Sequence, residues 1–335
     1  MSTSSPTSSP TSSPTSAVPS TLHLVDPELV APLQTFPAFV LTNELLPLLR
    51  EGQKQMMAAM PKPENPGVKI EAKKIPGLDG PEVGVMIYTP QHAAGPLPAV
   101  LHMHGGGYLF GDAEMMDIPN TMLAAQLQCV VVSVDYRLAP EAHFPAPLND
   151  CYAALKWLHD NAAALSVDPK RIATKGESAG GGLAAALALM ARDKGEVPII
   201  FQQLDAPMLD DRTCTTKSPN AFTGEFVWNR DANHFAWSSM LGQEPGSAGI
   251  SHYAAAARAE SLAGLPATYI LVGALDLFLD ENIDYAKRLL AAGVPTELHV
   301  YPGVYHGFQI AQTSRVVQES YRESLAALGR AFAAK

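Results

Sequence analysis

The chain has 335 residues, a hydrophobic content of 47% and a formal net charge of −10 at pH 7. This length allows one large α/β domain or two smaller ones. The acidic balance, without a basic cluster, argues against nucleic acid as a partner. The three cysteines lack metal-type spacing and do not suggest a disulfide framework. No apolar run is long enough for a transmembrane helix, so we expect no stable membrane insertion.

The first 20 residues are low in complexity, with Thr-Ser-Ser-Pro repeated from Thr3 to Pro14. Such a stretch has no apolar side chains to bury, so we predict a disordered tail over 1–20. It lacks the charged start and apolar middle of a secretory signal, which favours a cytoplasmic protein. The next stretch, 21–65, is apolar and helical, with predicted helix starts at Asp26 and Asn43.

Strands and helices then alternate. Residues 68–75 and 83–88 predict a hairpin, and 99–104 and 130–136 read as buried strands. The remaining expected elements are a helix over 149–158, a strand over 171–174, a helix over 183–192, strands over 199–204 and 269–273, a helix over 282–291, a strand over 297–301 and a helix over 316–333. This alternation predicts an α/β fold: a mostly parallel central sheet with helices on both faces, and ligands at the carboxyl ends of the strands.

Residues 207–250 depart from this alternation of strands and helices. They hold two of the three tryptophans and few strand signals, so we interpret them as a helical cap inserted into the catalytic core. The predicted organisation is therefore a tail (1–20), N-terminal cap helices (21–65), a first core part (66–206), the cap insertion (207–250) and a second core part (251–335).

The stretch Gly176–Gly180 has the pattern Gly-x-Ser-x-Gly between a predicted strand and a predicted helix. A nucleophile that stands clear of the backbone needs a sharp turn, and Gly176 and Gly180 remove side chains that would collide there. Ser178 is the candidate nucleophile. A serine that caps the helix in a glycine-rich turn is the alternative.

Three glycines follow His104 at the end of a buried strand. Glycines let backbone N–H groups face a ligand, so Gly106 and Gly107, with Ala179 at the start of the next helix, are candidate oxyanion-hole donors. His102 and His104 share one strand face but have no further candidate ligands, so we expect no metal site.

Acyl transfer by a serine also needs a base and a carboxylate that orients it. His306 follows the last strand and is the candidate base. Asp276 follows the strand 269–273 and is the candidate carboxylate, with Asp280 and Glu281 as rivals that could simply cap the next helix. The order serine, aspartate, histidine is that of α/β-hydrolases.

With these motifs the sequence resembles the α/β-hydrolases, and among them the hormone-sensitive-lipase-like esterases. The resemblance runs from about residue 66 to the C-terminus and includes 104–107, 136–141, 176–180, 207–212, 264–266, 276–281 and 306–308. It implies a carboxylic-ester hydrolase for short- to medium-chain esters, without a metal or organic cofactor. It also implies Ser178, Asp276 and His306 as the triad, an oxyanion hole of Gly106, Gly107 and Ala179, and a supporting role for Glu177.

Substrate choice is expected in the cap. His104 and Gly105 are expected beside the site, and the candidate pocket walls are Tyr108, Phe110, Met208, Phe222, Trp228, Phe278 and Phe308, with ordinary core packing as the alternative for each. The expected partner is a small ester, and the protein is expected to be a monomer or homodimer. An amidase, arylformamidase or lactonase on the same triad stays open, as does a catalytically idle small-molecule binder.

Overall fold

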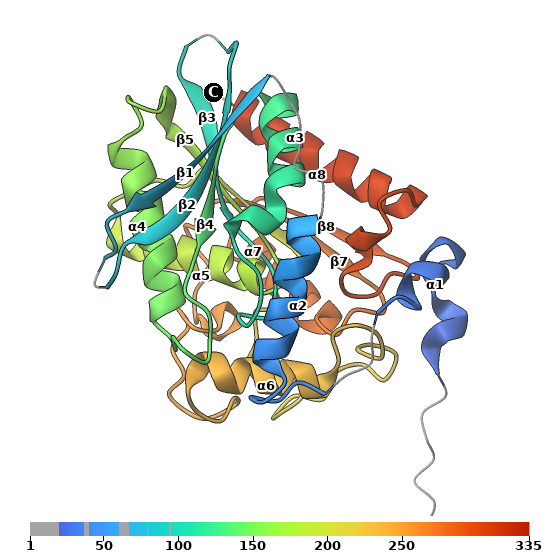
Figure 1. Ribbon diagram of the computed structural model, residues 1–335. Coiled ribbons are helices and arrows are strands. Elements are labelled where there is room, and N and C mark those ends of the chain that lie inside the picture. Colours follow the sequence, from blue (N-terminus) through green and yellow to red (C-terminus); the bar gives the residue numbers. More distant parts are fainter. Residues whose placement is uncertain (1–19, 37–39, 60–66, 79, 94, 335) are drawn as a thin grey trace, which may run out of the picture.

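A central sheet of eight strands organises the protein (Figure 1). The structure is a computed structural model and describes residues 20–36, 40–59, 67–78, 80–93 and 95–334. The strands are β1 (Val68–Ile75), β2 (Val83–Pro90), β3 (Leu97–Met103), β4 (Val130–Asp135), β5 (Val167–Glu177), β6 (Phe201–Asp205), β7 (Ala267–Gly273) and β8 (Thr296–Tyr301). Their spatial order is β1-β2-β4-β3-β5-β6-β7-β8, with β1 and β2 antiparallel to their neighbours and the other strands parallel.

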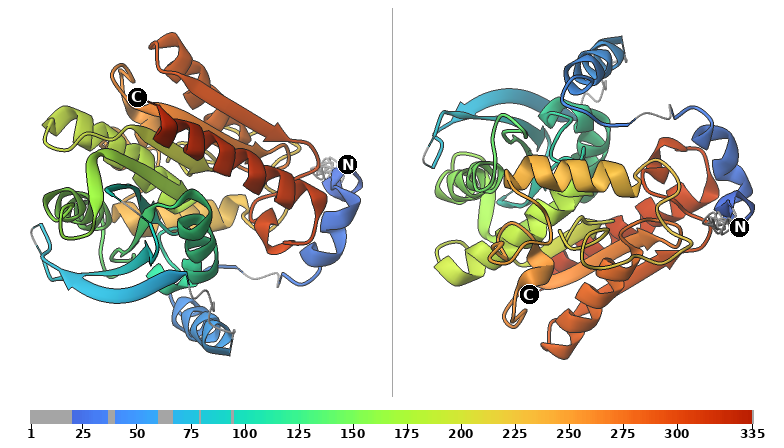
Figure 2. Two further views of the ribbon diagram at one scale, coloured as in Figure 1. Left: turned by 90° about the horizontal axis from the view of Figure 1, so that it is seen from above. Right: turned by 90° about the horizontal axis from the view of Figure 1, so that it is seen from below.

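Helices cover both faces of the sheet (Figures 1 and 2). The α-helices are α1 (Pro27–Leu33), α2 (Leu46–Ala59), α3 (Asp117–Leu127), α4 (Ala146–Asp160), α5 (Ala179–Lys194), α6 (Arg230–Leu241), α7 (Leu279–Ala291) and α8 (Arg315–Ala333). Short 3₁₀ turns lie at Thr21–Leu24, Ala113–Met116, Ala256–Arg258 and Phe308–Ile310. One apolar layer contains buried residues of α4, α5 and α7, and the other contains those of α3 and α8. The α/β class, the hairpin and the mostly parallel sheet are confirmed.

Two local expectations differ from the structure. The helix α3 fills the stretch between β3 and β4, where no helix was predicted. The helix expected after Asn43 begins at Leu46, and the side chain of Thr42, not Asn43, accepts a hydrogen bond from the N–H of Leu45 at 3.2 Å. Pro47 lies in the first turn of this helix, where the missing N–H of proline costs no helical bond.

The N-terminal region touches the core at two separate places. Arg50 in α2 donates to the carbonyl of Leu109 at 2.8 Å and to that of Ala139 at 2.6 Å, and it pairs with Glu141 at 2.7 Å. The segment 20–33 lies beside the loop that follows β8 (Figure 2). The predicted tail falls outside the described residues except for Ser20.

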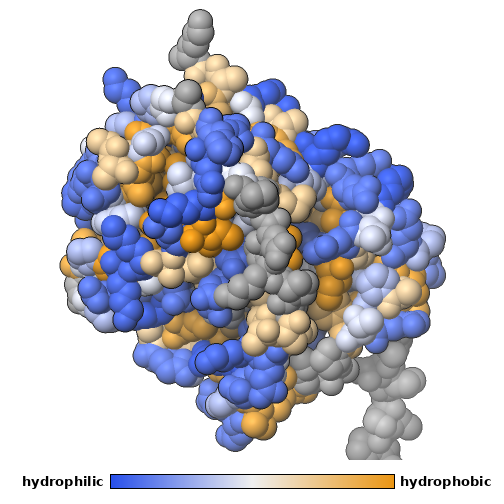
Figure 3. Space-filling model, turned by 45° about the horizontal axis from the view of Figure 1, so that its top comes forward, coloured by the Kyte–Doolittle hydropathy of each residue, from blue (hydrophilic) through white to orange (hydrophobic). Residues whose placement is uncertain are grey.

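The insertion after β6 contains one helix, α6, which Figure 2 shows crossing the end of the sheet when the molecule is seen from below. The rest of this segment is turn and loop. On the face seen in Figure 3, hydrophilic and hydrophobic residues are interspersed. Every helix in the described ranges is too short or too polar to cross a bilayer.

Candidate active site

Ser178 occupies the sharp turn between β5 and α5. Its backbone has φ 54° and ψ −119°, a conformation that costs a non-glycine residue energy and is found where the fold forces it. A Cβ on Gly176 would lie 2.2 Å from the carbonyl oxygen of Gly180, and one on Gly180 would lie 2.1 Å from that of Met103. The two glycines therefore let β5, α5 and β3 come close enough to raise the serine out of the sheet.

The structure brings Ser178, Asp276 and His306 together. Ser178 Oγ lies 2.9 Å from His306 Nε2, and His306 Nδ1 lies 2.7 Å from Asp276 Oδ2. The other carboxylate oxygen of Asp276 accepts from the N–H of Phe278 at 2.9 Å. Asp276 is only 1% exposed, so its charge acts on the imidazole through little solvent. This is the arrangement that a serine nucleophile, its base and an orienting acid require.

The loop after β3 turns back beside the serine. Gly106 and Gly107 have φ of 118° and 61°, which glycine adopts without strain. Among the described residues, the N–H groups of these two glycines have no hydrogen-bond acceptor in the protein. The N–H of Ala179 belongs to the first turn of α5, whose donors have no partner within the helix.

The side chain of His104 contacts the backbone of this loop. It is fully buried, stacks on Tyr136 at 4.2 Å between ring centroids, and its Nδ1 lies 2.7 Å from the carbonyl of Gly105. Burial lowers the pKa of His104 to about 4, so its ring is neutral at pH 7. A Cβ on Gly105 would lie 3.2 Å from the carbonyl oxygen of Glu177, which places this loop directly against the serine turn.

A buried polar cluster lies behind the serine turn. Lys175 pairs with Glu177 and lies 3.2 Å from Asp205, while His102 Nε2 lies 2.9 Å from Glu177. Burial opposes the charge of Glu177, but Lys175 and His102 outweigh it and hold the pKa of this carboxyl below its usual range. Burial raises the pKa of Asp205. Sequence reasoning named Glu177 but missed Lys175 and Asp205, because their pairing depends on the register between β5 and β6.

The expected pocket walls divide into two groups. Tyr108, Met208, Phe278 and Phe308 are at most 2% exposed and pack in the core, although the Phe278 ring meets the His306 ring edge-on at 5.1 Å between centroids. Phe110 and Trp228 are half-buried, and Phe222 is 55% exposed. Trp228 lies against the glycine loop and 6.3 Å from the His306 ring centroid.

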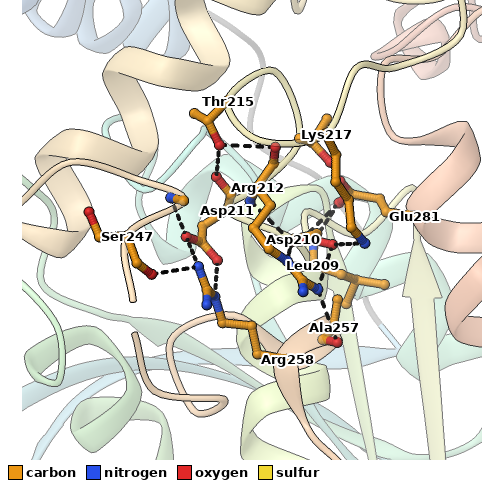
Figure 4. A network of polar contacts seen from close by, with 12 residues as sticks. Leu209, Asp210, Asp211, Arg212, Thr215, Lys217, Ser247, Ala257, Arg258 and Glu281 are labelled. Atoms are coloured by element: carbon orange, nitrogen blue, oxygen red, sulfur yellow. Dashed lines mark hydrogen bonds and ion pairs between the residues drawn. The ribbon is translucent and has the colours of Figure 1, made fainter. Parts of the chain in front are cut away.

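The rivals of Asp276 have other partners. Asp280 accepts from the N–H of Asn220 at 2.9 Å. Glu281 accepts from the N–H of Leu209 at 2.7 Å and from the hydroxyl of Thr213, as part of the polar network in Figure 4. Burial raises the pKa of Glu281 well above its usual range. Both side chains thus bond to the segment that follows β6 and not to the imidazole.

His102 and His104 do not form part of a metal site in the described ranges, where no group of three or more potential ligands gathers. His102 instead bonds to Glu177 and lies 3.0 Å from Ser133 Oγ.

Comparisons with known proteins agree with this geometry. A family model described as the alpha/beta hydrolase fold matches residues 100–310. The carboxylesterase NlhH of Mycobacterium tuberculosis is 34% identical over 92% of this chain and 96% of its own length. A solved structure of a bacterial heroin esterase is 42% identical, with a TM-score of 0.86 over 93% of this chain and 99% of that one.

A second solved structure, esterase LipW from Mycobacterium marinum, is 37% identical, with a TM-score of 0.83 over 93% of this chain and 97% of that one. The match therefore covers more than nine tenths of this chain and nearly the whole of each solved structure. The chain belongs to the hormone-sensitive-lipase-like esterases of the α/β-hydrolase fold family, and it is a carboxylic-ester hydrolase.

Proposed function

We propose that Ser178 is the nucleophile, His306 the general base and Asp276 the orienting carboxylate of a serine carboxylesterase. The observation that carries this proposal is the continuous contact from Ser178 Oγ through both nitrogens of His306 to Asp276. His306 takes the hydroxyl proton as Ser178 attacks the ester carbonyl. Asp276 holds the imidazole in the required tautomer and stabilises its cation.

The tetrahedral oxyanion is bound by the N–H groups of Gly106, Gly107 and Ala179 in this proposal. Loss of one such donor typically costs about 2.7–4 kcal/mol of transition-state stabilisation. His306 then gives its proton to the departing alcohol, which leaves an acyl-enzyme on Ser178. His306 then takes a proton from water as the water oxygen attacks the acyl carbonyl. The bond from the acyl carbon to Ser178 Oγ breaks, His306 returns the proton to Oγ, and the acid is released. Glu177 supports the serine turn from behind.

The proposed substrates are small esters with short to medium acyl chains. The bulky Phe278 ring packs beside the triad and meets the His306 ring edge-on. Such a site favours small acids over long ones. The esterase names of the related proteins support an ester bond as the target, and an amide or lactone on the same triad is the alternative to be tested beside it.

The test is hydrolysis of p-nitrophenyl esters from acetate to dodecanoate by wild type and Ser178→Ala. We expect wild type to favour the shorter chains and the variant to lose at least about 10⁴-fold in kcat. Anilides and lactones of matched acids are assayed in parallel. A folded Ser178→Ala protein with wild-type activity would overturn the assignment of the nucleophile, and preferential cleavage of the anilides would favour the amidase alternative.

A further inference from the structure

Trp228 comes from the cap segment between β6 and α6 and reaches the catalytic residues. A Cβ placed on Gly107 would lie 2.2 Å from Trp228 Cη2 and 3.0 Å from Cζ2 and Cζ3, so the six-membered ring of the indole rests on this glycine. The indole also lies 6.3 Å from the His306 ring, with 44° between the planes. One aromatic side chain therefore adjoins both the glycine loop and the proposed base.

The position of this indole is held by buried polar contacts. Its Nε1–H donates to Asn233 Oδ1 at 3.2 Å, and Asn233, which is fully buried, donates through Nδ2 to the carbonyl of Thr213 at 3.1 Å. The backbone N–H of Trp228 donates to the carbonyl of Phe226 at 2.7 Å. The half-buried Trp228 is thus held by hydrogen bonds of both its backbone and its indole nitrogen. We therefore interpret it as an ordered wall of the site.

The side of the substrate that meets this wall follows from the stereochemistry of acyl transfer. The carbonyl carbon attached to Ser178 Oγ carries three groups: the oxyanion, the departing alkoxide and the acyl chain. The oxyanion must face the N–H groups of the glycine loop, and the alkoxide oxygen must face His306 Nε2 to receive its proton. A wall between Gly107 and His306 thus borders the alcohol, while the acyl chain points away from it.

We infer that Trp228 determines specificity for the alcohol half of the ester, favouring planar aromatic alcohols over bulky non-planar ones. This inference rests on the catalytic assignment proposed above. An aryl group can lie against the indole in an offset-stacked or edge-on arrangement, whereas a saturated ring of the same carbon number is thicker and gains no ring–ring interaction. The expected discrimination from one such aromatic pair is about 3- to 10-fold.

The experiment compares kcat/KM for phenyl acetate, cyclohexyl acetate and phenyl hexanoate in wild type, Trp228→Leu and Trp228→Phe. The difference in leaving-group reactivity cancels because each ester is compared between proteins. We expect Trp228→Leu to lower the ratio of phenyl to cyclohexyl acetate by about 3- to 10-fold, with Trp228→Phe retaining most of it. The ratio of acetate to hexanoate should stay unchanged. Leu290→Ala, at an exposed apolar side chain of α7, is the control and should alter neither ratio.

Two results would overturn the inference. A changed acetate-to-hexanoate ratio with a constant phenyl-to-cyclohexyl ratio would place Trp228 on the acyl side. An equal loss for all three esters would mean that Trp228 only holds Gly107 or His306 in place. Thermal unfolding checks each variant, and Trp228→Met replaces Trp228→Leu if the latter does not fold. If the catalytic assignment itself is wrong, Ser178→Ala retains activity, and this outcome does not depend on the Trp228 variants.

Discussion

At the residue scale, Asp276 contacts His306 through the ring nitrogen that faces away from Ser178. Its proposed role is therefore to fix the tautomer of the imidazole. Asp276→Asn keeps the size of the side chain but presents an amide that can donate to Nδ1 and leave the proton on Nε2. We expect kcat to fall by about 10⁴-fold for short esters, with the fold intact. Asp280→Asn, four residues away at the start of α7, is the control and should keep activity within a fewfold of wild type. Steady-state kinetics with both variants decide between Asp276 and its neighbour.

Lys175 pairs with both Glu177 and Asp205, and all three side chains are at most 18% exposed. Lys175→Met leaves two buried carboxylates without this partner, so we expect the free energy of unfolding to fall by about 3–5 kcal/mol at pH 8. Without the ammonium one carboxyl pKa is raised in the folded state. A raised carboxyl pKa penalises folding above that pKa and the penalty eases as pH falls, so the loss should be smaller at pH 5.

Urea unfolding at both pH values measures this difference. The double variant Lys175→Met with Asp205→Asn restores the charge of the cluster and should recover part of the lost stability. A loss that is the same at pH 5 and pH 8, and that the second substitution does not reduce, would show that Lys175 acts by packing alone.

At the scale of elements, the loop after β6 is fixed by acidic residues with different partners (Figure 4). Asp211, fully buried, receives two hydrogen bonds from Arg258, at 2.5 and 2.8 Å. Asp210 is 1% exposed and pairs with Arg212 at 2.7 Å and Lys217 at 2.8 Å. Burial opposes the charge of Asp210, but these two cations outweigh it and lower the pKa of this carboxyl. The cap insertion is thereby anchored at its start by charge.

Because the folded pKa of Asp210 lies below its unfolded value, its contribution to stability is present above about pH 4 and is lost as pH falls through the folded pKa. Asp210→Asn should therefore lower the free energy of unfolding by about 1–3 kcal/mol at pH 7 and by progressively less toward pH 3. Chemical unfolding across this range tests it. Asp160→Asn, at a 55% exposed side chain in a loose surface pair, should change stability little at any pH. A deficit of Asp210→Asn that is constant with pH would contradict the assigned cause.

Some of these elements could be predicted from the sequence and others could not. The turn at Ser178 could be predicted because its causes are local: a strand, two glycines and a run of helix formers. The helix α3 could not, since Pro119 and Asn120 interrupt its pattern and packing against β2, β4 and α8 supplies its stability. The place of Trp228 depends on Asn233 and Gly107, which only tertiary structure brings to it. Triad members follow separate strands, so their order could be predicted and their distances could not.

At the scale of the whole molecule, the segment 20–33 joins the loop of the proposed base to the cap. Glu225 accepts hydrogen bonds of 2.6 Å from the hydroxyl of Ser20 and from both the N–H and the hydroxyl of Thr21. On the other side the N–H of Asp26 donates to the carbonyl of Gly303 at 2.9 Å, and the buried hydroxyl of Tyr305 donates to the carbonyl of Leu29 at 3.0 Å. The segment therefore restrains the residue that immediately precedes His306.

Two shortened chains distinguish the contribution of the segment 20–33 from that of the residues before it. A chain that begins at Ser20 retains all the contacts just described, and we expect its activity and thermal stability to match those of the full chain. A chain that begins at Gln34 loses the hydrogen bond from the Tyr305 hydroxyl to Leu29, worth about 0.5–1.5 kcal/mol, and exposes to water the apolar surface that Leu29 covers. Its midpoint of thermal unfolding should fall by several degrees. Because the loop of His306 is loosened, kcat should fall more than KM rises.

The substitution Tyr305→Phe distinguishes the two contributions. In the full chain it removes a buried, satisfied hydrogen bond and should lower the free energy of unfolding by about 0.5–1.5 kcal/mol. In the chain that begins at Gln34 the hydroxyl is already open to water, so the same substitution should change stability little. This difference between the two chains is expected only if the contact between Tyr305 and Leu29 exists in solution. If both shortened chains keep full kcat, the segment stabilises the fold without restraining His306, and the position of the base is then determined by Asp276 and the loop after β8 alone.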